Sequence, residues 1–273
     1  MGSVRLTSPK IRHKVPLRDH LLPRVSPWLM SWFLRYVPFY TRRHLHAVRI
    51  AGEEHIRAVG AKPLIVYMNH PGWWDPMIAA ILAREYFPVR THYAPIDAAA
   101  LRKYAFFARL GFFGVDDSFH GSRRFLQIAE QVLLRSNAAL WITAQGKFCD
   151  VRRRPVILAS GLAHLASRMD GITILPVAVE YVFWEERTPE ALVRVGAPLV
   201  AGSVASKASW QNRLQAQLTT IMDELAEDAL NRRDSAFRTI VSGRSGVGGS
   251  YDLWRRSRAA LRGQHFSPSH GND

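Results

Sequence analysis

The sequence predicts an α/β fold in which a mixed, largely parallel sheet is flanked by helices. Short apolar runs of strand-forming residues alternate with longer segments of helical periodicity, a pattern typical of strands joined by helices. The 273 residues and the 48% hydrophobic content are those of a globular protein with a sizeable core. We therefore expect one large α/β domain with terminal extensions.

Apolar segments bounded by turn residues are predicted to form the strands. The clearest is residues 64–68, which follow Pro63 and precede a turn-rich loop. Pro176 cannot donate to a strand ladder, so we expect its strand to be broken or bulged there. Residues 111–115 are expected to form a tight connection. The predicted strands are residues 64–68, 89–94, 138–143, 171–183 and 192–195.

Helices are predicted where apolar residues recur at helical spacing. Asp75 followed by Pro76 is typical of an N-cap and a first helical position, so we expect a helix to begin there and to extend toward Tyr86. The longest helical pattern lies near the C-terminal end of the domain. The predicted helices are residues 75–86, 98–110, 122–135, 158–168 and 210–233.

The chain is divided by composition into four parts. We expect residues 1–24 to form a basic, flexible arm, residues 25–45 a helical segment at a membrane interface, residues 46–235 the folded domain, and residues 236–273 a basic, disordered tail. The basic residues are concentrated in the two end segments.

The net charge indicates an anionic partner. The chain has 37 Lys and Arg against 22 Asp and Glu, which fits nucleic acid, acidic lipid headgroups or phosphorylated substrates. The sequence has no helix-turn-helix, zinc-knuckle or aromatic RNA-binding signature, so we expect no nucleic-acid partner. The single cysteine, Cys149, excludes an intramolecular disulfide and a cysteine-based zinc site.

Residues 27–40 have the composition of a segment that lies in the lipid headgroup zone. Aromatic residues are interspersed there with basic ones, and Arg35 lies in the middle of the apolar stretch. A membrane-spanning helix needs ~20 mostly apolar residues, so this segment is too short to span. Packing of the same helix on the domain is an equally good interpretation. The N-terminus lacks a secretory apolar region with a cleavage site, so we expect no signal peptide.

The strongest chemical signal is the loop from Asn69 to Pro76. It places His70 at the end of a strand and Asp75 at the start of a helix, with Gly72 and two tryptophans between them. A histidine can take a proton from a substrate hydroxyl while a carboxylate on its other ring nitrogen fixes the tautomer. The substrate alcohol is then the nucleophile. The spacing lacks the second histidine of a zinc hydrolase, so we expect no metal. No strand precedes the tail's approximation to a serine-hydrolase motif, so we do not expect a serine nucleophile.

The His-x-x-x-x-Asp pattern after an apolar strand resembles the first motif of the glycerolipid acyltransferases, the family that includes the 1-acylglycerol-3-phosphate acyltransferases. Residues 111–117, 141–147 and 175–179 follow in the order of the family's second, third and fourth motifs. Together these blocks cover roughly residues 64–200. The resemblance implies the family's fold, an acyltransferase domain over residues 46–235, and its catalytic pair, here His70 and Asp75.

Substrate-binding positions are expected from the same resemblance and from nearby basic residues. Lys147 and Arg152 are expected from their charge to bind a phosphate group, and a solvated basic loop is an equally good interpretation of them. Two departures from the family concern the acceptor: Asp117 stands where lysophosphatidate-specific members have arginine, and Gln145 stands where the family has glutamate. The chain therefore resembles a divergent, bacterial-type branch. The implied substrate-binding residues are Asn69, Gly72, Trp73, Gly111, Arg123, Arg124, Gln145, Gly146, Lys147, Arg152 and Pro176.

The resemblance implies an O-acyltransferase that moves a fatty acyl group from a thioester to a lysophospholipid or another membrane lipid alcohol. It implies no cofactor beyond acyl-CoA or acyl carrier protein as co-substrate, and the sequence leaves the choice of donor and the oligomeric state open. We expect a peripheral protein on the cytoplasmic side of the inner membrane, bound to an anionic surface. The alternatives are acylation of a glycolipid or lipid-linked sugar, and a non-enzymatic basic protein that binds membrane or nucleic acid.

Overall fold

The structure is a computed structural model that describes residues 18–202 and 204–243. Its centre is a mixed sheet in the order β4-β3-β5-β2-β6-β7-β1-β9, and β8 pairs with β6 beside this path. The strands from β4 to β6 are parallel, β7 is antiparallel to β6, and β1 is parallel to β7. The predicted fold class is thus confirmed. The strands are β1 Ala47–Ala51, β2 Leu64–Met68, β3 Thr91–Asp97, β4 Phe112–Val115, β5 Ala138–Thr143, β6 Thr173–Val182, β7 Glu190–Val195, β8 Leu199–Val200 and β9 Arg238–Ser242.

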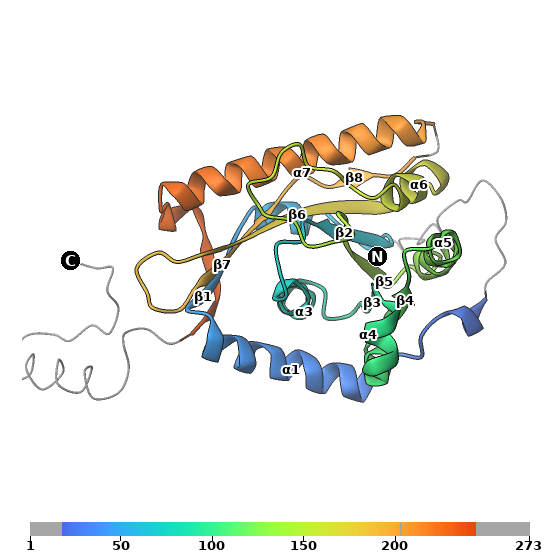
Figure 1. Cartoon of the computed structure of the whole chain (residues 1–273), viewed down its shortest axis with the longest axis horizontal. Helices are drawn as coiled ribbons and strands as arrows, with labels where there is room; N and C mark the ends of the chain where they lie inside the picture. Colours follow the sequence, from blue (N-terminus) through green and yellow to red (C-terminus); the bar gives the residue numbers. More distant parts are fainter. Residues whose placement is uncertain (1–17, 203, 244–273) are drawn as a thin grey trace, which may run out of the picture.

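Helices cover both faces of the sheet. Figure 1 shows α1 and α3 on one side of the sheet and α6 and α7 on the other. The helices are α1 Pro27–His44, α2 Glu53–Arg57, α3 Asp75–Tyr86, α4 Ala98–Lys103, α5 Phe119–Leu133, α6 Gly161–Arg168 and α7 Lys207–Leu230, and the short 3-10 helices are η1 Asp19–Leu21, η2 Ala105–Leu110 and η3 Asp234–Ala236.

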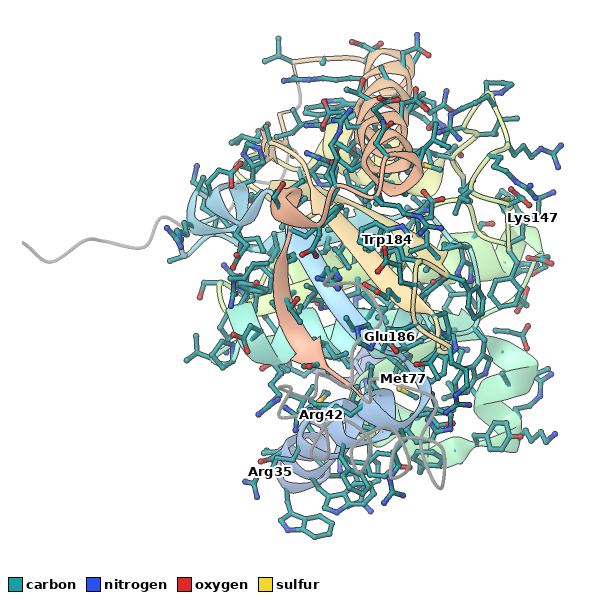
Figure 2. All side chains as sticks on the ribbon, turned by 90° about the vertical axis from the view of Figure 1, so that its left-hand side faces the viewer. Arg35, Arg42, Met77, Lys147, Trp184 and Glu186 are labelled. Atoms are coloured by element: carbon teal, nitrogen blue, oxygen red, sulfur yellow. The ribbon has the colours of Figure 1, made fainter. Side chains whose placement is uncertain are left out.

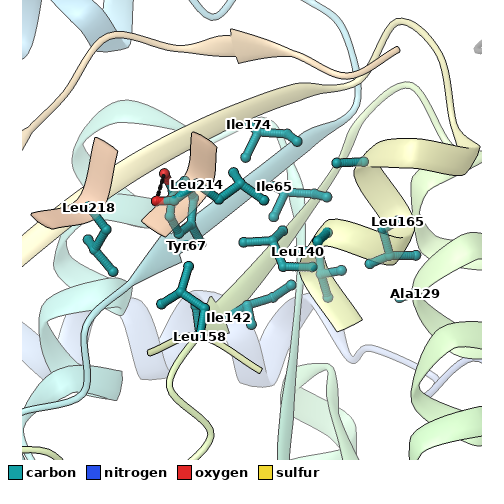
Figure 3. Packing of buried hydrophobic residues seen from close by; sticks show 14 of the residues in the cluster. Ile65, Tyr67, Ala129, Leu140, Ile142, Leu158, Leu165, Ile174, Leu214 and Leu218 are labelled. Carbon is teal, nitrogen blue, oxygen red and sulfur yellow. Dashed lines mark hydrogen bonds between the residues drawn. The ribbon is translucent and has the colours of Figure 1, made fainter. Parts of the chain in front are cut away.

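The core has two layers because successive side chains of a strand point to opposite faces. In β2, Ile65 and Tyr67 pack with α5, α6 and α7, whereas Leu64 and Met68 pack with α1 and α3. All five β2 residues are buried, as expected for a central strand covered on both faces. Figure 3 shows the first layer, in which the Tyr67 hydroxyl donates to the Leu214 carbonyl of α7 at 3.2 Å.

On the β4 side of the sheet, one predicted element type was wrong and one predicted helix is divided in two. Residues 112–115, expected to be a tight connection, form β4 parallel to β3. The predicted helix 98–110 is two helices, α4 and η2, which are separated at Tyr104. A Cβ added to Gly114 would lie 3.2 Å from the Ala98 Cα, so α4 packs directly against β4 at this glycine. A four-residue strand that contains a glycine gives little sequence signal.

The predicted interruption at Pro176 does not occur. β6 runs continuously through this residue, which lies opposite Tyr67 in the parallel pairing with β2. On the other side of β6, β8 pairs with residues 173–174 and β7 with residues 177–182. Pro176 lies at the junction of these two partners, and its carbonyl accepts from the Gly196 N–H at 3.0 Å. The proline therefore falls where the regular ladder already changes partner.

The domain extends beyond both expected boundaries. After residue 235, β9 pairs antiparallel with β1, so the start of the expected tail belongs to the sheet. Before residue 25, Leu22 is buried and the Arg18 N–H donates to Gln131 of α5 at 2.7 Å. The remainder of the expected arm and tail, residues 1–17 and 244–273, lies outside the described residues.

Candidate active site

His70 and Asp75 meet where β2 ends and α3 begins. The Nδ1 atom of His70 lies 2.5 Å from Oδ2 of Asp75, and the Asp75 side chain is fully buried while that of His70 is 17% exposed. Because Nδ1–H donates to the carboxylate, Nε2 is the ring nitrogen that can accept a proton. The sequence analysis named both residues, and the fold brings them together.

The role expected of Asp75 as an N-cap is not observed. Trp74 is the N-cap residue of α3, and Asp75 is its first residue. The Asp75 carboxylate instead accepts the Gly72 N–H on Oδ2 at 3.1 Å and the Tyr181 hydroxyl on Oδ1 at 2.7 Å. Oδ2 therefore bonds to the histidine and the loop, and Oδ1 bonds to β6.

Tyr181 was missed by the sequence analysis. It lies near the end of β6 and on the same side of the sheet as α3. Burial, together with the neighbouring Asp75 charge, raises the pKa of Tyr181 well above its ordinary value, so the hydroxyl stays protonated and donates. The strand was predictable, but its register against the loop was not, and register decides which β6 residue faces Asp75.

The backbone of His70 is held by the loop that follows β5. Its N–H donates to Oε1 of Gln145 at 2.9 Å, and its carbonyl accepts from the Cys149 N–H at 2.9 Å. The segment that resembles the third motif therefore contacts the first directly. Oε1 of Gln145 therefore accepts a hydrogen bond from the backbone of the candidate base.

Aromatic side chains stand beside the histidine. The Phe148 ring centroid lies 4.4 Å from that of His70, and Phe148 is 62% exposed. Trp73 is 61% exposed, and its ring meets Trp74 edge-on. Trp74 in turn packs against Tyr40 of α1. The aromatic side chains on the loop after His70 therefore pack against α1.

Several predicted substrate-binding residues are exposed on the segment after β5 and on α5. Gly146, Lys147 and Arg152 are exposed on the segment after β5, and Figure 2 shows Lys147 at the periphery of the molecule. Arg152 forms an ion pair with Asp150 at 2.7 Å, which partly offsets its charge. Arg123 and Arg124 are exposed in the second turn of α5. β4 and β2 run in the same direction, so their carboxyl ends lie at the same end of the sheet. His70 follows β2 at this end, and α5 follows β4 there.

Three other predicted binding residues have places that favour a structural role. The Asn69 side chain is 1% exposed and bonds to the Val179 backbone. Gly111 has a φ of +86° and precedes β4, so it lies at the opposite end of that strand from the His70 edge. Pro176 is buried inside β6.

A separate cleft of about 970 Å³ lies away from the histidine. It is bounded by the start of α1, the end of α3 and the start of β3, and residues such as Arg24, Leu34, Arg84 and Thr91 line it. Within residues 18–202 and 204–243, no cluster of three or more histidine, cysteine or acidic side chains could hold a metal ion. In the same part of the chain, no helix combines the length and apolarity needed to cross a membrane.

Comparison with known proteins gives a family and a fold. The model of the acyltransferase family matches residues 47–180, about half of the chain. A crystal structure of the 1-acyl-sn-glycerophosphate (LPA) acyltransferase PlsC from Thermotoga maritima superposes with a TM-score of 0.50 and 13% sequence identity, over 72% of this chain and 81% of that one. No curated protein sequence matches significantly. At this identity the likeness to PlsC concerns the fold.

Proposed function

The chain belongs to the acyltransferase family, and on that premise we propose that it moves a fatty acyl group from an acyl thioester to a hydroxyl of a membrane lipid. The observation that carries the mechanism is the 2.5 Å contact between His70 Nδ1 and the buried Asp75 carboxylate. A lysophospholipid or another membrane lipid alcohol is the acceptor. Acyl-CoA or acyl carrier protein is the donor, as a co-substrate.

The proposed reaction begins with the acceptor hydroxyl beside Nε2 of His70. His70 removes the hydroxyl proton as the oxygen attacks the thioester carbonyl carbon, and Asp75 stabilises the imidazolium that forms. When the tetrahedral intermediate collapses, the carbon–sulfur bond breaks, and the leaving thiolate takes the proton from His70. The products are an ester and a free thiol, and the histidine returns to its neutral form.

The residues around the histidine support this chemistry. Phe148 offers apolar surface for an acyl chain or a lipid acceptor next to the base, and Trp73 is exposed on the same loop as His70. Gln145 holds the His70 backbone and offers its amide nitrogen to an acceptor oxygen. In this proposal Lys147, Arg152, Arg123 and Arg124 bind phosphate groups of the donor or the acceptor.

We place the protein at an anionic membrane surface through α1, as a peripheral protein on the cytoplasmic side of the inner membrane. One face of this helix exposes Trp28, Trp32, Tyr36 and Phe39, which are between 37% and 76% accessible. Figure 2 shows Arg35 and Arg42 on the same helix, at the opposite end of the molecule from α7. Aromatic rings flanked by arginines suit the headgroup level. Trp74 packs α1 against the His70 loop, and we propose that this contact holds the base close to the membrane surface.

A glycolipid or lipid-linked sugar is the second candidate acceptor. Asp116 and Asp117 are exposed at the carboxyl end of β4, where lysophosphatidate-specific relatives would have an arginine. A carboxylate there repels a phosphate monoester but leaves a sugar or alcohol unaffected. A non-enzymatic membrane-binding or nucleic-acid-binding protein is less favoured, because it has no need for a buried carboxylate against a largely buried histidine.

The activity is tested with the purified full-length protein on vesicles. Radiolabelled acyl-CoA and acyl carrier protein are each offered with lysophosphatidate, other lysophospholipids, diacylglycerol and glycolipids, and the lipid products are separated and counted. Lipid profiling of a deletion strain shows which acylated lipid is lost from cells that lack the protein. We expect one acceptor class to be acylated. A folded protein that acylates none of these acceptors with either donor would contradict the proposed function.

A further inference from the structure

Tyr181 reaches the His70–Asp75 pair from a strand that the sequence places far away. Its hydroxyl donates to Oδ1 of Asp75 at 2.7 Å, across a sequence separation of 106 residues. His70 and the Gly72 N–H bond to the other oxygen, Oδ2. The two carboxylate oxygens are therefore held by different elements, β6 on one side and the loop after β2 on the other.

A buried carboxylate needs such donors, because it has lost the water that would otherwise solvate it. Asp75 is fully buried, so a carboxylate oxygen that loses its donor has no water molecule to replace the lost hydrogen bond. A bond to Oδ1 alone also fixes the rotation of the carboxylate plane, which determines how Oδ2 faces the histidine. Tyr181 is suited to this task because its stiff ring is anchored in the sheet.

We propose that Tyr181 is a positioning residue of the acyl-transfer site, which orients Asp75 and limits how strongly that carboxylate attracts the proton on His70. This inference rests on the proposed function for its kinetic consequence, but its structural consequence can be measured without any substrate. Hydrogen bonding to a carboxylate spreads its charge and stabilises the anion. Without Tyr181, the carboxylate is the stronger base and draws the proton onto His70 more strongly.

This change alters the pH dependence of the reaction. A more basic pair keeps His70 protonated to higher pH. The acidic limb of the kcat/KM profile, which reports the loss of the free base, therefore moves upward. Other titratable or charged groups on the surrounding elements are Glu180 of β6, His44 of α1, and Lys147, Cys149, Asp150, Arg152 and Arg154 of the segment after β5. These groups are the same in wild type and in a Tyr181 variant, so they do not cause a difference between the two pH profiles.

The test compares Tyr181→Phe with a matched control, Tyr86→Phe. The Tyr86 hydroxyl of α3 also bonds to a carboxylate at 2.7 Å, that of Glu53, but it lies at the other end of the helix from Asp75. In the acyl-transfer assay with the full-length protein, we expect Tyr181→Phe to lower kcat/KM about 10- to 100-fold. We also expect it to move the acidic limb of the pH profile of kcat/KM upward by about half a pH unit or more. Tyr86→Phe should leave both unchanged.

The second measurement is independent of activity. The ring carbon of ¹³C-labelled histidine is followed by NMR across the pH range, and the His70 signal is assigned by its loss in His70→Gln. We expect the titration midpoint of His70 to rise in Tyr181→Phe and to stay in place in Tyr86→Phe. If the midpoint stays within about 0.2 pH unit of wild type, the positioning role is wrong. A shifted midpoint in a protein that acylates nothing would support the positioning role and contradict the proposed function alone.

Discussion

The side-chain amide of Asn69 pairs with the peptide groups of Val179 in both directions. Its Nδ2 donates to the Val179 carbonyl at 2.9 Å, and its Oδ1 accepts from the Val179 N–H at 2.8 Å. The last backbone pair between β2 and β6 is Met68 with Val177, so Asn69 extends the ladder by one step as β2 leaves the sheet. The loop that carries His70 is thus fixed to β6, two residues before Tyr181.

Asn69→Ala should weaken both the fold and the site. The substitution leaves the Val179 donor and acceptor buried without their partner, which we expect to lower the free energy of unfolding by about 2–4 kcal/mol. Urea unfolding followed by circular dichroism measures this loss. Asn212→Ala, on the exposed face of α7, is the control and should stay within about 0.5 kcal/mol of wild type. Equal effects of the two substitutions would show that the Asn69 bonds contribute nothing.

The exposed aromatic face of α1 should determine membrane binding. We expect Trp28→Ala combined with Trp32→Ala to reduce cosedimentation with vesicles of phosphatidylcholine and phosphatidylglycerol at least severalfold, because both rings are more than half exposed. Salt should weaken the binding, since arginines accompany the rings. Leu230→Ala, an exposed apolar residue at the end of α7, is the control. Unchanged binding of the double variant would refute a role for α1.

The acidic end of β4 should disfavour lysophosphatidate. Asp117 is exposed there, and a carboxylate near the acceptor repels a phosphate that carries close to two charges. We expect a lower kcat/KM for lysophosphatidate than for uncharged lipid alcohols, and a narrower gap in Asp117→Arg. A strong native preference for lysophosphatidate that is lost in Arg123→Ala or Lys147→Ala would instead reveal a relocated phosphate site.

His92 should make the fold sensitive to mild acid. Its Nδ1 accepts a hydrogen bond from the Trp141 indole at 3.1 Å, and burial, helped by the charge of Arg90, lowers the pKa of His92 from 6.5 to about 4. The native state therefore resists protonation, and its stability is fully present above pH 6.5 and declines as the pH falls toward 4.

Urea unfolding at pH 7 and pH 5 tests this dependence. We expect wild type to lose about 1–2 kcal/mol more than His92→Gln between these two pH values. The glutamine variant should itself be less stable at pH 7, because its side chain does not reproduce the imidazole packing. Parallel losses in the two proteins would exclude His92 as the source.

The sequence was sufficient for the elements that contain their own signals. The apolar run of residues 64–68 and the following Asp75-Pro76 pair located β2 and the start of α3, and thereby His70. Elements defined by distant partners were missed. Residues 47–51 of β1 pair with residues 238–242 of β9. Neither short segment alone has a pattern that predicts a strand, because the stability of each strand depends on its pairing with the other.

The same limit applied to the site. His70, Asp75 and Gln145 could be identified from the sequence, because they lie in motifs that follow the order of the glycerolipid acyltransferase motifs. Tyr181 and the Asn69–Val179 bonds depend on how β6 is registered against β2, and this register comes from packing on both faces of the sheet. The burial of Asp75 likewise follows from the packing of α3 and β6, which a local pattern does not contain.

The most direct test of the account is acyl transfer by His70→Ala. With the acceptor and donor identified for wild type, the initial rate is compared among wild type, His70→Ala, Asp75→Asn and His55→Ala, a histidine of α2 that pairs with Glu54. General-base catalysis contributes ~10²–10⁴-fold, so His70→Ala should lose at least ~100-fold in kcat, Asp75→Asn nearly as much, and His55→Ala nothing. A folded His70→Ala protein that keeps more than about half of the wild-type turnover would contradict the assignment of His70 as the base.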